Sequence, residues 1–428
     1  LPPDRRMALL DALAAMLLRE ADAIVAAIDA DFAPRCAEET LLAEVKLVVD
    51  AARHARRHLR RWARTRRGAV PFAFWPTRAV VEPVPKGVVG IMAPWNYPVQ
   101  LLLLPAVDAL AAGNRVVLKP SEAVPRTAAL LARLVPAALG EDVARVVTGG
   151  PDVAAAFAAQ PWDHLVFTGG TATGVKVMRA AAEHLVPLTL ELGGKCPVVV
   201  LPGADLAVAA RAILAGKAIN AGQTCVAPDT VLLVGHAREA FLVACRAAGG
   251  IVPETAIVDD RQAARLDALR DGAALTPLGA VGEGRLHPLA LAEAPPGHRM
   301  SEEEIFGPVL ALEACADLNA AIGWIAARPP PLAIYLFGAT AAEERAVAER
   351  TKSGAIVQDR CVEYAAFTAL PFGGVGASGF GRRNGEAGFL EFSTLRARVR
   401  DGGRFSLARL LDPPRSARAR ALVRRLLR

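Results

Sequence analysis

Short runs of valine and leucine recur along the chain, and longer stretches with helical periodicity separate them. Residues 116–118 (VVL) and 198–201 (VVVL) are two such runs. An apolar run without polar alternation suits a strand covered on both faces, and strands that alternate with helices form parallel sheets. The pattern therefore predicts an α/β fold in which helices flank a parallel sheet.

Composition sets the scale of this fold. The chain has 428 residues, 53% of them hydrophobic, which is enough to bury more than one core and to form two or three domains. Its six cysteines include no CxxC pair, so neither a disulfide framework nor a zinc site is indicated. A reducing compartment is expected, and the cytoplasm is the default location. No apolar stretch reaches the roughly 18 to 20 residues that a membrane-spanning helix needs.

The formal net charge of +7 is concentrated in residues 53–67 and 396–428. The first cluster follows a helical pattern with apolar positions at Leu59 and Trp62, so its arginines are expected to form a solvated face. The basic tail mixes leucine and arginine at helical spacing, and packing or disorder is favoured over contact with an anionic membrane. Nucleic-acid binding is not expected, because the basic runs have little aromatic interleaving and contain no nucleic-acid module.

Residues 88–138 read as a βαβ unit. Strands are expected at 88–92 and 116–119, with a helix at 99–112 between them. A second helix is expected at 127–138, with Ser121 as its N-cap.

Three other segments are assigned. Residues 1–62 carry apolar side chains at three- and four-residue spacing and are predicted to be helical. The proline-rich segment 78–87 reads as an exposed strand or hairpin. Residues 163–183 repeat the order of strand, glycine-rich loop and helix.

Cys225 and Glu191 offer the clearest chemistry. Cys225 lies in residues 222–228 (GQTCVAP), and Glu191 begins residues 191–195 (ELGGK). A thiol nucleophile and a carboxylate base are the two groups needed to form a thioester and then hydrolyse it. From the residues alone, Cys225 could instead be a small buried hydrophobe. Glu191 could be a surface strand end or the ribose-binding acid of a conventional dinucleotide fold.

Five further motifs follow one another along the chain. They are residues 94–98 (PWNYP), 119–122 (KPSE), 167–170 (FTGG), 303–308 (EEIFGP) and 371–374 (PFGG). Together with the Cys225 and Glu191 segments, this ordered set resembles the aldehyde dehydrogenase superfamily. Residues 223–229 (QTCVAPD) are most similar to its class 3 and coniferyl-aldehyde branch. The resemblance runs from about residue 3 to residue 392 and is weakest at 235–300, where no detailed assignment is made.

The resemblance implies a Rossmann-type cofactor domain, an α/β catalytic domain and a small bridging arm. The NAD(P)-binding domain would comprise residues 1–77 and 89–193, and the catalytic domain residues 194–388. Residues 78–88 and 389–428 would form the bridging and oligomerisation segments, including the basic C-terminal tail. A homodimer is expected, because the segment that corresponds to 78–87 bridges subunits in the family.

The resemblance also implies catalytic roles. Cys225 would attack an aldehyde, while the Asn96 amide and the Cys225 backbone N–H hold the oxyanion. Hydride would pass to a nicotinamide, and Glu191 would activate water to hydrolyse the thioester. Without the resemblance, Asn96 would be a routine residue of a proline-flanked turn. The implied function is NAD(P)-dependent oxidation of a hydrophobic aldehyde, aliphatic or aromatic, to its carboxylic acid, with no metal.

Two alternatives stand beside this interpretation. An acylating relative would pass the thioester to coenzyme A and would have less need of a hydrolytic base, so the presence of Glu191 argues against it. A catalytically impaired binding or structural descendant would be expected to have lost Cys225 or Glu191, and both are present.

Eight residues are expected to contact the cofactor. Lys119 and Glu122 follow a buried strand, and by resemblance they would hold the adenosine ribose. Glu122 would favour NAD over NADP, although relatives that share it tolerate both. Residues 169–174 depart from GxGxxG but would direct a helix N-terminus at the pyrophosphate. The resemblance adds the nicotinamide contacts. The full set is Trp95, Lys119, Glu122, Gly169, Gly170, Gly174, Glu304 and Phe306.

Overall fold

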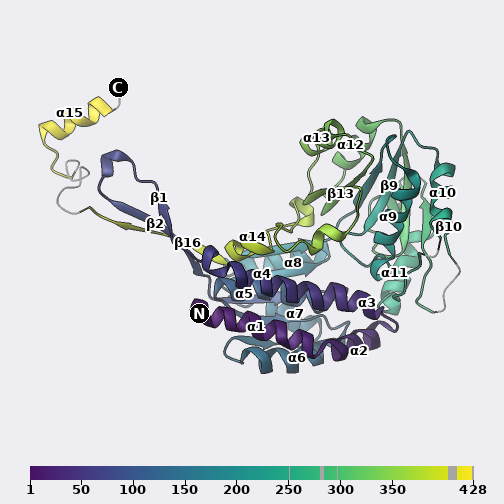
Figure 1. The fold of residues 1–428 in the computed structure, drawn as a ribbon, viewed down its shortest axis with the longest axis horizontal. Helices are drawn as coiled ribbons and strands as arrows, with labels where there is room; N and C mark the ends of the chain where they lie inside the picture. Colours follow the sequence, from purple (N-terminus) through teal and green to yellow (C-terminus); the bar gives the residue numbers. More distant parts are fainter. Residues whose placement is uncertain (250, 280–283, 296, 403–411, 427–428) are drawn as a thin grey trace.

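The computed structural model describes residues 1–428 except 250, 280–283, 296, 403–411 and 427–428. Figure 1 shows two bodies, each built on one sheet, and a slender arm that extends away from them. Among the described residues, the two large sheets have six and seven strands and the arm has three. The predicted α/β fold with a small arm is confirmed.

The first sheet has the strand order β15-β7-β6-β3-β4-β5, and only β15 runs antiparallel to its neighbour. Its strands are β3 (Val88–Met92), β4 (Arg115–Lys119), β5 (Ala144–Val146), β6 (His164–Gly169), β7 (Leu188–Leu192) and β15 (Gly379–Phe380). The predicted βαβ unit is present, and its strands meet at one carboxyl edge.

Helices cover both faces of this sheet. One face packs against α1 (Pro3–Arg19), α2 (Ala21–Phe32), α4 (Leu47–Trp62), α5 (Gln100–Ala112), α6 (Pro125–Leu139) and α14 (Gly385–Glu391). The other packs against α7 (Pro151–Ala158) and α8 (Thr171–Ala182). The short α3 (Ala37–Glu39) and a π-helical turn (Thr40–Lys46) lead into α4.

The predicted N-cap was wrong. Helix α6 begins at Pro125, and its N-cap is Val124, which has no side-chain capping bond. The Ser121 hydroxyl instead accepts from the Ala123 backbone N–H at 3.2 Å, which closes a local turn. Proline at the first helical position needs no hydrogen-bonded N–H, so the helix starts there.

The second sheet has the order β10-β11-β12-β9-β8-β13-β14. Its strands are β8 (Cys196–Val200), β9 (Pro228–Val234), β10 (Ala274–Pro277), β11 (Ala290–Glu293), β12 (Val309–Cys315), β13 (Ala333–Phe337) and β14 (Ala355–Gln358). The helices α9 (Leu206–Ala218) and α10 (Arg238–Ala247) pack on one face, and α12 (Leu318–Ala326) and α13 (Ala341–Arg350) on the other. Helix α11 (Asp260–Arg270) lies near β11 and β12 in a smaller cluster.

The arm is an antiparallel sheet of β1 (Arg66–Gly68), β2 (Arg78–Pro85) and β16 (Ser393–Arg400). Strand β16 pairs with β2 along its whole length, so residues more than 300 positions apart form one ribbon. Figure 1 places α15 (Ala417–Leu426) beyond this ribbon, at the same end of the molecule.

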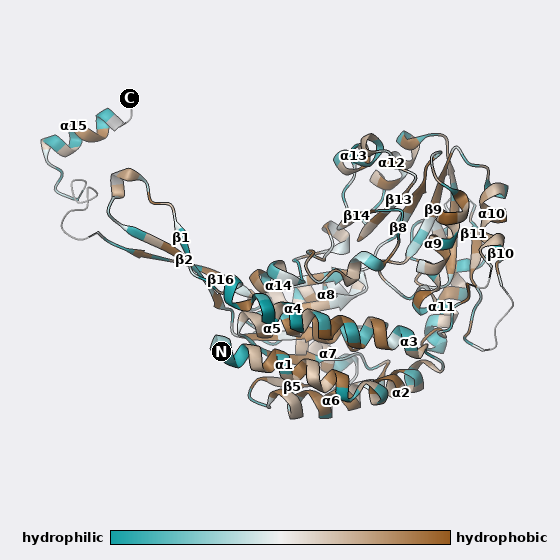
Figure 2. Ribbon diagram, in the orientation of Figure 1, coloured by the Kyte–Doolittle hydropathy of each residue, from teal (hydrophilic) through white to brown (hydrophobic). Residues whose placement is uncertain are grey.

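Figure 2 shows apolar residues along strands of the second sheet such as β8, β9 and β13, whereas polar residues alternate with apolar ones on the front helix α4. All residues of α5 are buried, which makes it the central helix of the first body. Among the described residues, none of the helices has the length and apolar character needed to cross a lipid bilayer.

Candidate active site

Cys225 lies in the loop between α9 and β9. The three consecutive residues Asn220, Ala221 and Gly222, the last of which begins the Cys225 motif, are all left-handed, with φ of 50°, 51° and 71°. A Cβ on Gly222 would lie 2.3 Å from the Gly307 backbone oxygen, so this turn needs glycine. The turn brings the half-buried Cys225 side chain to the wall of two cavities, one on each side of it.

The Cys225 thiol is protonated in this environment. Burial raises its pKa to about 12, and the nearby Glu304 and Glu191 carboxylates add to the effect. Because the thiolate is the attacking species, Cys225 must lose its proton to a base when it reacts.

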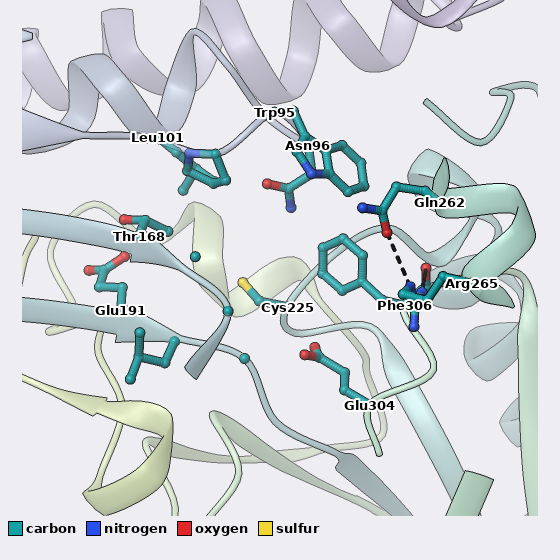
Figure 3. A pocket seen from close by; sticks show the side chains of 15 residues that line it. Trp95, Asn96, Leu101, Thr168, Glu191, Cys225, Gln262, Arg265, Glu304 and Phe306 are labelled. Carbon is teal, nitrogen blue, oxygen red and sulfur yellow. Dashed lines mark hydrogen bonds between the residues drawn. The ribbon is translucent and has the colours of Figure 1, made fainter. Parts of the chain in front are cut away.

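Asn96 lies in the loop between β3 and α5 and is buried. Its Nδ2 donates to the Gln223 backbone oxygen at 3.0 Å, which joins this loop to the Cys225 loop. The Asn96 backbone oxygen accepts from Asn220 Nδ2 at 2.9 Å and from Arg35 Nη1 at 3.0 Å. Figure 3 shows the Asn96 amide and the Cys225 sulfur bordering the same space.

Glu191 lies on β7 and is 4% exposed. Its carboxylate forms an ion pair with the Arg383 Nε, and both side chains are buried. Burial raises the pKa of Glu191, while the Arg383 guanidinium opposes that rise. Figure 3 shows the carboxylate to one side of Cys225 and not directed at its sulfur.

The first cavity has a volume of about 250 Å³ and collects most of the predicted residues. It is lined by Trp95, Asn96, Gly169, Gly170, Glu191, Cys225, Glu304 and Phe306. Lys119, Glu122 and Gly174 do not line it. Lys119 is buried at the end of β4, with its Nζ 3.5 Å from Glu122 Oε2. Gly174 lies in α8, where a Cβ would come within 2.7 Å of Leu192, so glycine there permits close helix–strand packing.

The residues around α8 fit a dinucleotide. Gly170 is the N-cap of this helix and provides no side-chain cap, so the first N–H groups are available to an anion. The Thr168 hydroxyl is buried and has no hydrogen-bond partner among the described residues. A Cβ on Gly170 would meet nothing within 4 Å, which indicates open space in front of the helix.

Glu304 and Phe306 close the opposite side of the cavity. Burial raises the pKa of Glu304 to about 8, and the nearby Asp229 carboxylate adds to the rise. A Cβ on Gly193 would lie 2.0 Å from Glu304 Oε2, so glycine makes room for this carboxylate. The Phe306 and Trp95 rings meet edge to face, with their centroids 5.5 Å apart.

Sequence patterns did not identify the residues that support the side of the cavity formed by Glu304 and Phe306. Lys195 forms a buried ion pair with Asp229 and donates to the Glu303 backbone oxygen at 3.0 Å. From α11, Arg265 donates to the backbone oxygen of Ile305 at 2.7 Å. Helix α11 lies within the 235–300 segment that received no detailed assignment.

The second cavity has a volume of about 560 Å³ and is mostly apolar. Its lining includes Tyr97, Leu101, Val226, Val362, Phe367 and Phe372, together with Cys225 and Arg383. These residues come from distant segments, and no local pattern marked them as one surface. Cys225 therefore lines both this apolar cavity and the dinucleotide-like cleft.

The family resemblance extends over most of the chain. The family model described as "Aldehyde dehydrogenase family" matches residues 1–397. The chain belongs to the aldehyde dehydrogenase family. It is therefore an oxidoreductase that acts on an aldehyde group, as the sequence predicted.

Known aldehyde dehydrogenases match this one over most of their length. The chain is 42% identical to the "Probable coniferyl aldehyde dehydrogenase" of Pseudomonas aeruginosa, over 99% of this chain and 91% of that protein. The solved "Substrate bound state of Staphylococcus Aureus AldH" has a TM-score of 0.90 and 31% identity, covering 94% of this chain and 91% of the other.

A solved P. syringae relative, the indole-3-acetaldehyde dehydrogenase AldA in complex with NAD+, has a TM-score of 0.85 and 26% identity, covering 94% and 85% of the two chains. The predicted likeness to the class 3 and coniferyl-aldehyde branch is confirmed, since family 3 members are also among the relatives. The predicted NAD(P) dependence is confirmed for the family to which this aldehyde dehydrogenase belongs.

Proposed function

We propose that this aldehyde dehydrogenase oxidises a hydrophobic aldehyde, aliphatic or aromatic, to its carboxylic acid. The observation that carries the proposal is the apolar cavity of about 560 Å³ that Cys225 helps to line. An aldehyde whose body is apolar gains free energy by leaving water for such a lining. The name of the coniferyl aldehyde dehydrogenase relative supports an aromatic substrate.

The proposed reaction uses three residues. The Cys225 thiol gives its proton to a water molecule in the cavity, and its sulfur bonds to the carbonyl carbon. The carbonyl oxygen becomes an oxyanion that accepts hydrogen bonds from Asn96 Nδ2 and the Cys225 backbone N–H. A bound nicotinamide would accept the hydride that leaves this carbon, and the carbon–oxygen double bond re-forms to give the thioester. Water then bonds to the thioester carbon and gives a proton to Glu191. The carbon–sulfur bond breaks, and Cys225 regains its proton.

We propose that the cleft in front of α8 holds the NAD(P). The uncapped first turn of α8, with Gly169 and Gly170 before it, suits the pyrophosphate. Trp95, Glu304 and Phe306 suit the nicotinamide end, because they line the cavity that includes Cys225. At the other end, Lys119 and Glu122 suit the adenosine ribose. The Glu122 carboxylate would repel a 2′-phosphate, so NAD is the expected preference.

The test measures reduction of NAD, and separately of NADP, with aromatic and long-chain aldehydes. Cys225→Ala is expected to abolish turnover, and Glu191→Gln to leave one turnover per site without steady-state hydrolysis. Cys315→Ala is the matched control, since Cys315 is a half-buried cysteine at the end of β12. Full activity of Cys225→Ala would contradict the proposal.

Acyl-coenzyme A formation in place of acid would identify the acylating alternative. No turnover by a folded wild-type protein that binds NAD would favour an impaired descendant.

We also propose a homodimer formed through the arm. The arm exposes apolar side chains: Val399 on β16 at 69%, and Phe72 at 81% and Trp75 at 63% in the connection between β1 and β2. Exposed apolar groups on a free sheet commonly mark a protein interface. Val399→Asp should convert the dimer to monomer in light scattering, whereas Leu185→Asp, at a position that is 90% exposed on the first body, should not. A Val399→Asp variant that stays dimeric would contradict this assignment.

We propose a domain division that follows the sheets. Residues 1–65 and 89–193 form the NAD(P)-binding domain, and residues 194–378 the catalytic domain. Residues 379–391 join the first body, because β15 pairs with β7 and α14 packs on α5. Residues 66–88, with β1 and β2, and residues 392–428 form the arm and tail. This division moves the expected boundaries at residues 77 and 388. A cytoplasmic location and the absence of nucleic-acid and membrane partners stay predictions.

A further inference from the structure

The ion pair between Glu191 and Arg383 is the unexpected feature of the site. The two residues lie 192 positions apart, and each side chain is 4% exposed. The pairing of β15 with β7 places Gly379 opposite Glu191, and the chain reaches Arg383 four residues later. A buried pair of this kind is costly to form and leaves an uncompensated charge if either partner is removed.

Arg383 is held firmly in place. Its backbone N–H donates to the Phe372 oxygen at 2.9 Å, and its oxygen accepts from the Phe372 N–H at 3.0 Å. The guanidinium also lies over the Phe372 ring, 4.8 Å from its centroid, which is within the distance of about 6 Å that defines a cation–π contact. Its Nη1 is buried and has no hydrogen-bond partner among the described residues. The arginine is therefore held at its backbone and at its guanidinium.

The pair spans the two cavities that meet at Cys225. Arg383 lines the apolar cavity, and Glu191 lines the dinucleotide-like cleft. In Figure 3 the Glu191 carboxylate is not directed at the sulfur. To take a proton from water at a Cys225 thioester, Glu191 must turn from the guanidinium or act through a water between them.

Other charged and titratable groups also face this carboxylate. Arg382 lowers its pKa, as Arg383 does, and Glu391 on α14 raises it. Asp108 on α5, Cys225 and Tyr364 lie close enough to interact with Glu191. A buried glutamate with no cation nearby can have a pKa of about 8 to 9, and an adjacent arginine lowers such a value by about 1 to 3 units. Arg383 is therefore the group that decides whether Glu191 is ionised near neutral pH.

We propose that Arg383 is a positioning residue that keeps Glu191 ionised and turned away from Cys225 while the thioester forms. Hydrolysis then begins when the carboxylate leaves the guanidinium and takes a proton from water. The inference rests on the proposed role of Glu191 as the hydrolytic base.

An activated ester isolates the step. p-Nitrophenyl acetate can acylate Cys225 without hydride transfer, because the thiol displaces p-nitrophenol and leaves an acetyl thioester. The burst of nitrophenol then reports acylation, and the later steady rate reports hydrolysis of that thioester. Both rates are measured from pH 5 to 9.5 for wild type, Arg383→Met, Arg383→Lys and Glu191→Gln.

The deciding measurement is the midpoint of the pH profile of hydrolysis, which is the pH at which the hydrolysis rate is half of its maximum. In Arg383→Met it is expected to rise by about one pH unit or more, because a buried carboxylate loses its cation. In Arg383→Lys, which keeps the charge, it is expected to stay within about half a unit of wild type. An unchanged midpoint in Arg383→Met would overturn the inference, since a merely structural role would lower rates without moving it.

Two further measurements keep the result decisive. If Arg383→Met does not fold, the midpoint of the wild-type hydrolysis profile tests the inference instead. A wild-type midpoint at or below about pH 7 supports the role of Arg383. A midpoint at about pH 8 to 9, the range of an unpaired buried glutamate, overturns it. Unchanged hydrolysis in Glu191→Gln would instead refute the base assignment itself, which separates failure of the proposed function from failure of the role of Arg383.

Discussion

The buried pair of Arg35 and Glu44 is expected to stabilise both the first body and the Asn96 loop. Glu44 Oε2 accepts from the backbone N–H groups of Val99 and Gln100 at 2.8 and 2.9 Å, at the start of α5. Its Oε1 lies 3.7 Å from Arg35 Nη2, and both side chains are 0% exposed. The Arg35 guanidinium also lies 4.6 Å from the Phe32 ring centroid. One carboxylate therefore caps a buried helix and balances a buried cation.

The size of the effect follows from these contacts. Glu44→Ala orphans two N–H groups and leaves Arg35 uncompensated, and breaking a buried pair in this way costs about 3–5 kcal/mol. Glu44→Gln keeps an acceptor for the N–H groups but loses the charge, so about 1–3 kcal/mol is expected. The control is Asp11→Asn, whose partner Arg56 lies at 2.6 Å with both side chains about half exposed. An exposed pair of this kind contributes about 0–1 kcal/mol.

The assay is guanidinium chloride unfolding at pH 8 for the three variants and wild type. Burial raises the pKa of Glu44 to about 7, so the carboxylate is ionised at this pH. The predicted order of destabilisation is Glu44→Ala, then Glu44→Gln, then Asp11→Asn. If Glu44→Ala costs no more than Asp11→Asn, the reasoning is refuted, because the buried pair would then stabilise the fold no more than an exposed one.

Three further changes test the local geometry. Burial raises the pKa of Asp108 to about 7, from a usual value near 4, so the folded state binds its proton more tightly. The contribution of this carboxyl to the free energy of unfolding is therefore full below about pH 4 and is lost as the pH rises through 7. Asp108→Asn should reduce the difference between the unfolding free energies measured at pH 5 and at pH 8. Gly193→Ala would place a Cβ 2.0 Å from Glu304 Oε2 and should weaken NAD binding several-fold by fluorescence titration, whereas Gly323→Ala on α12, where the added Cβ meets nothing within 4 Å, should not. Gly222→Ala would bring a Cβ within 2.3 Å of a backbone oxygen and should slow iodoacetamide labelling of Cys225; an unchanged rate would show that the loop tolerates a side chain there.

The sequence by itself determined the fold class and the residues that gather at the cleft. Parallel strands end at one edge of a sheet, so motifs after different strands converge there without further information. This is why Asn96 after β3, Gly170 after β6 and Glu191 near the end of β7 border one cavity. Cys225 reaches the same cavity from the second body, where it lies in the loop before β9. The local prediction at Ser121 failed because Pro125, a few residues later, provided a better helix start.

Only the tertiary structure decided which side chains support the site. Arg383 and Glu191 are separated by 192 residues, and their contact depends on how β15 docks on β7. The apolar cavity is likewise assembled from segments with no common periodicity. Sequence patterns record the spacing within one element, whereas a partner across the fold is selected by burial and by the need to pair a desolvated charge.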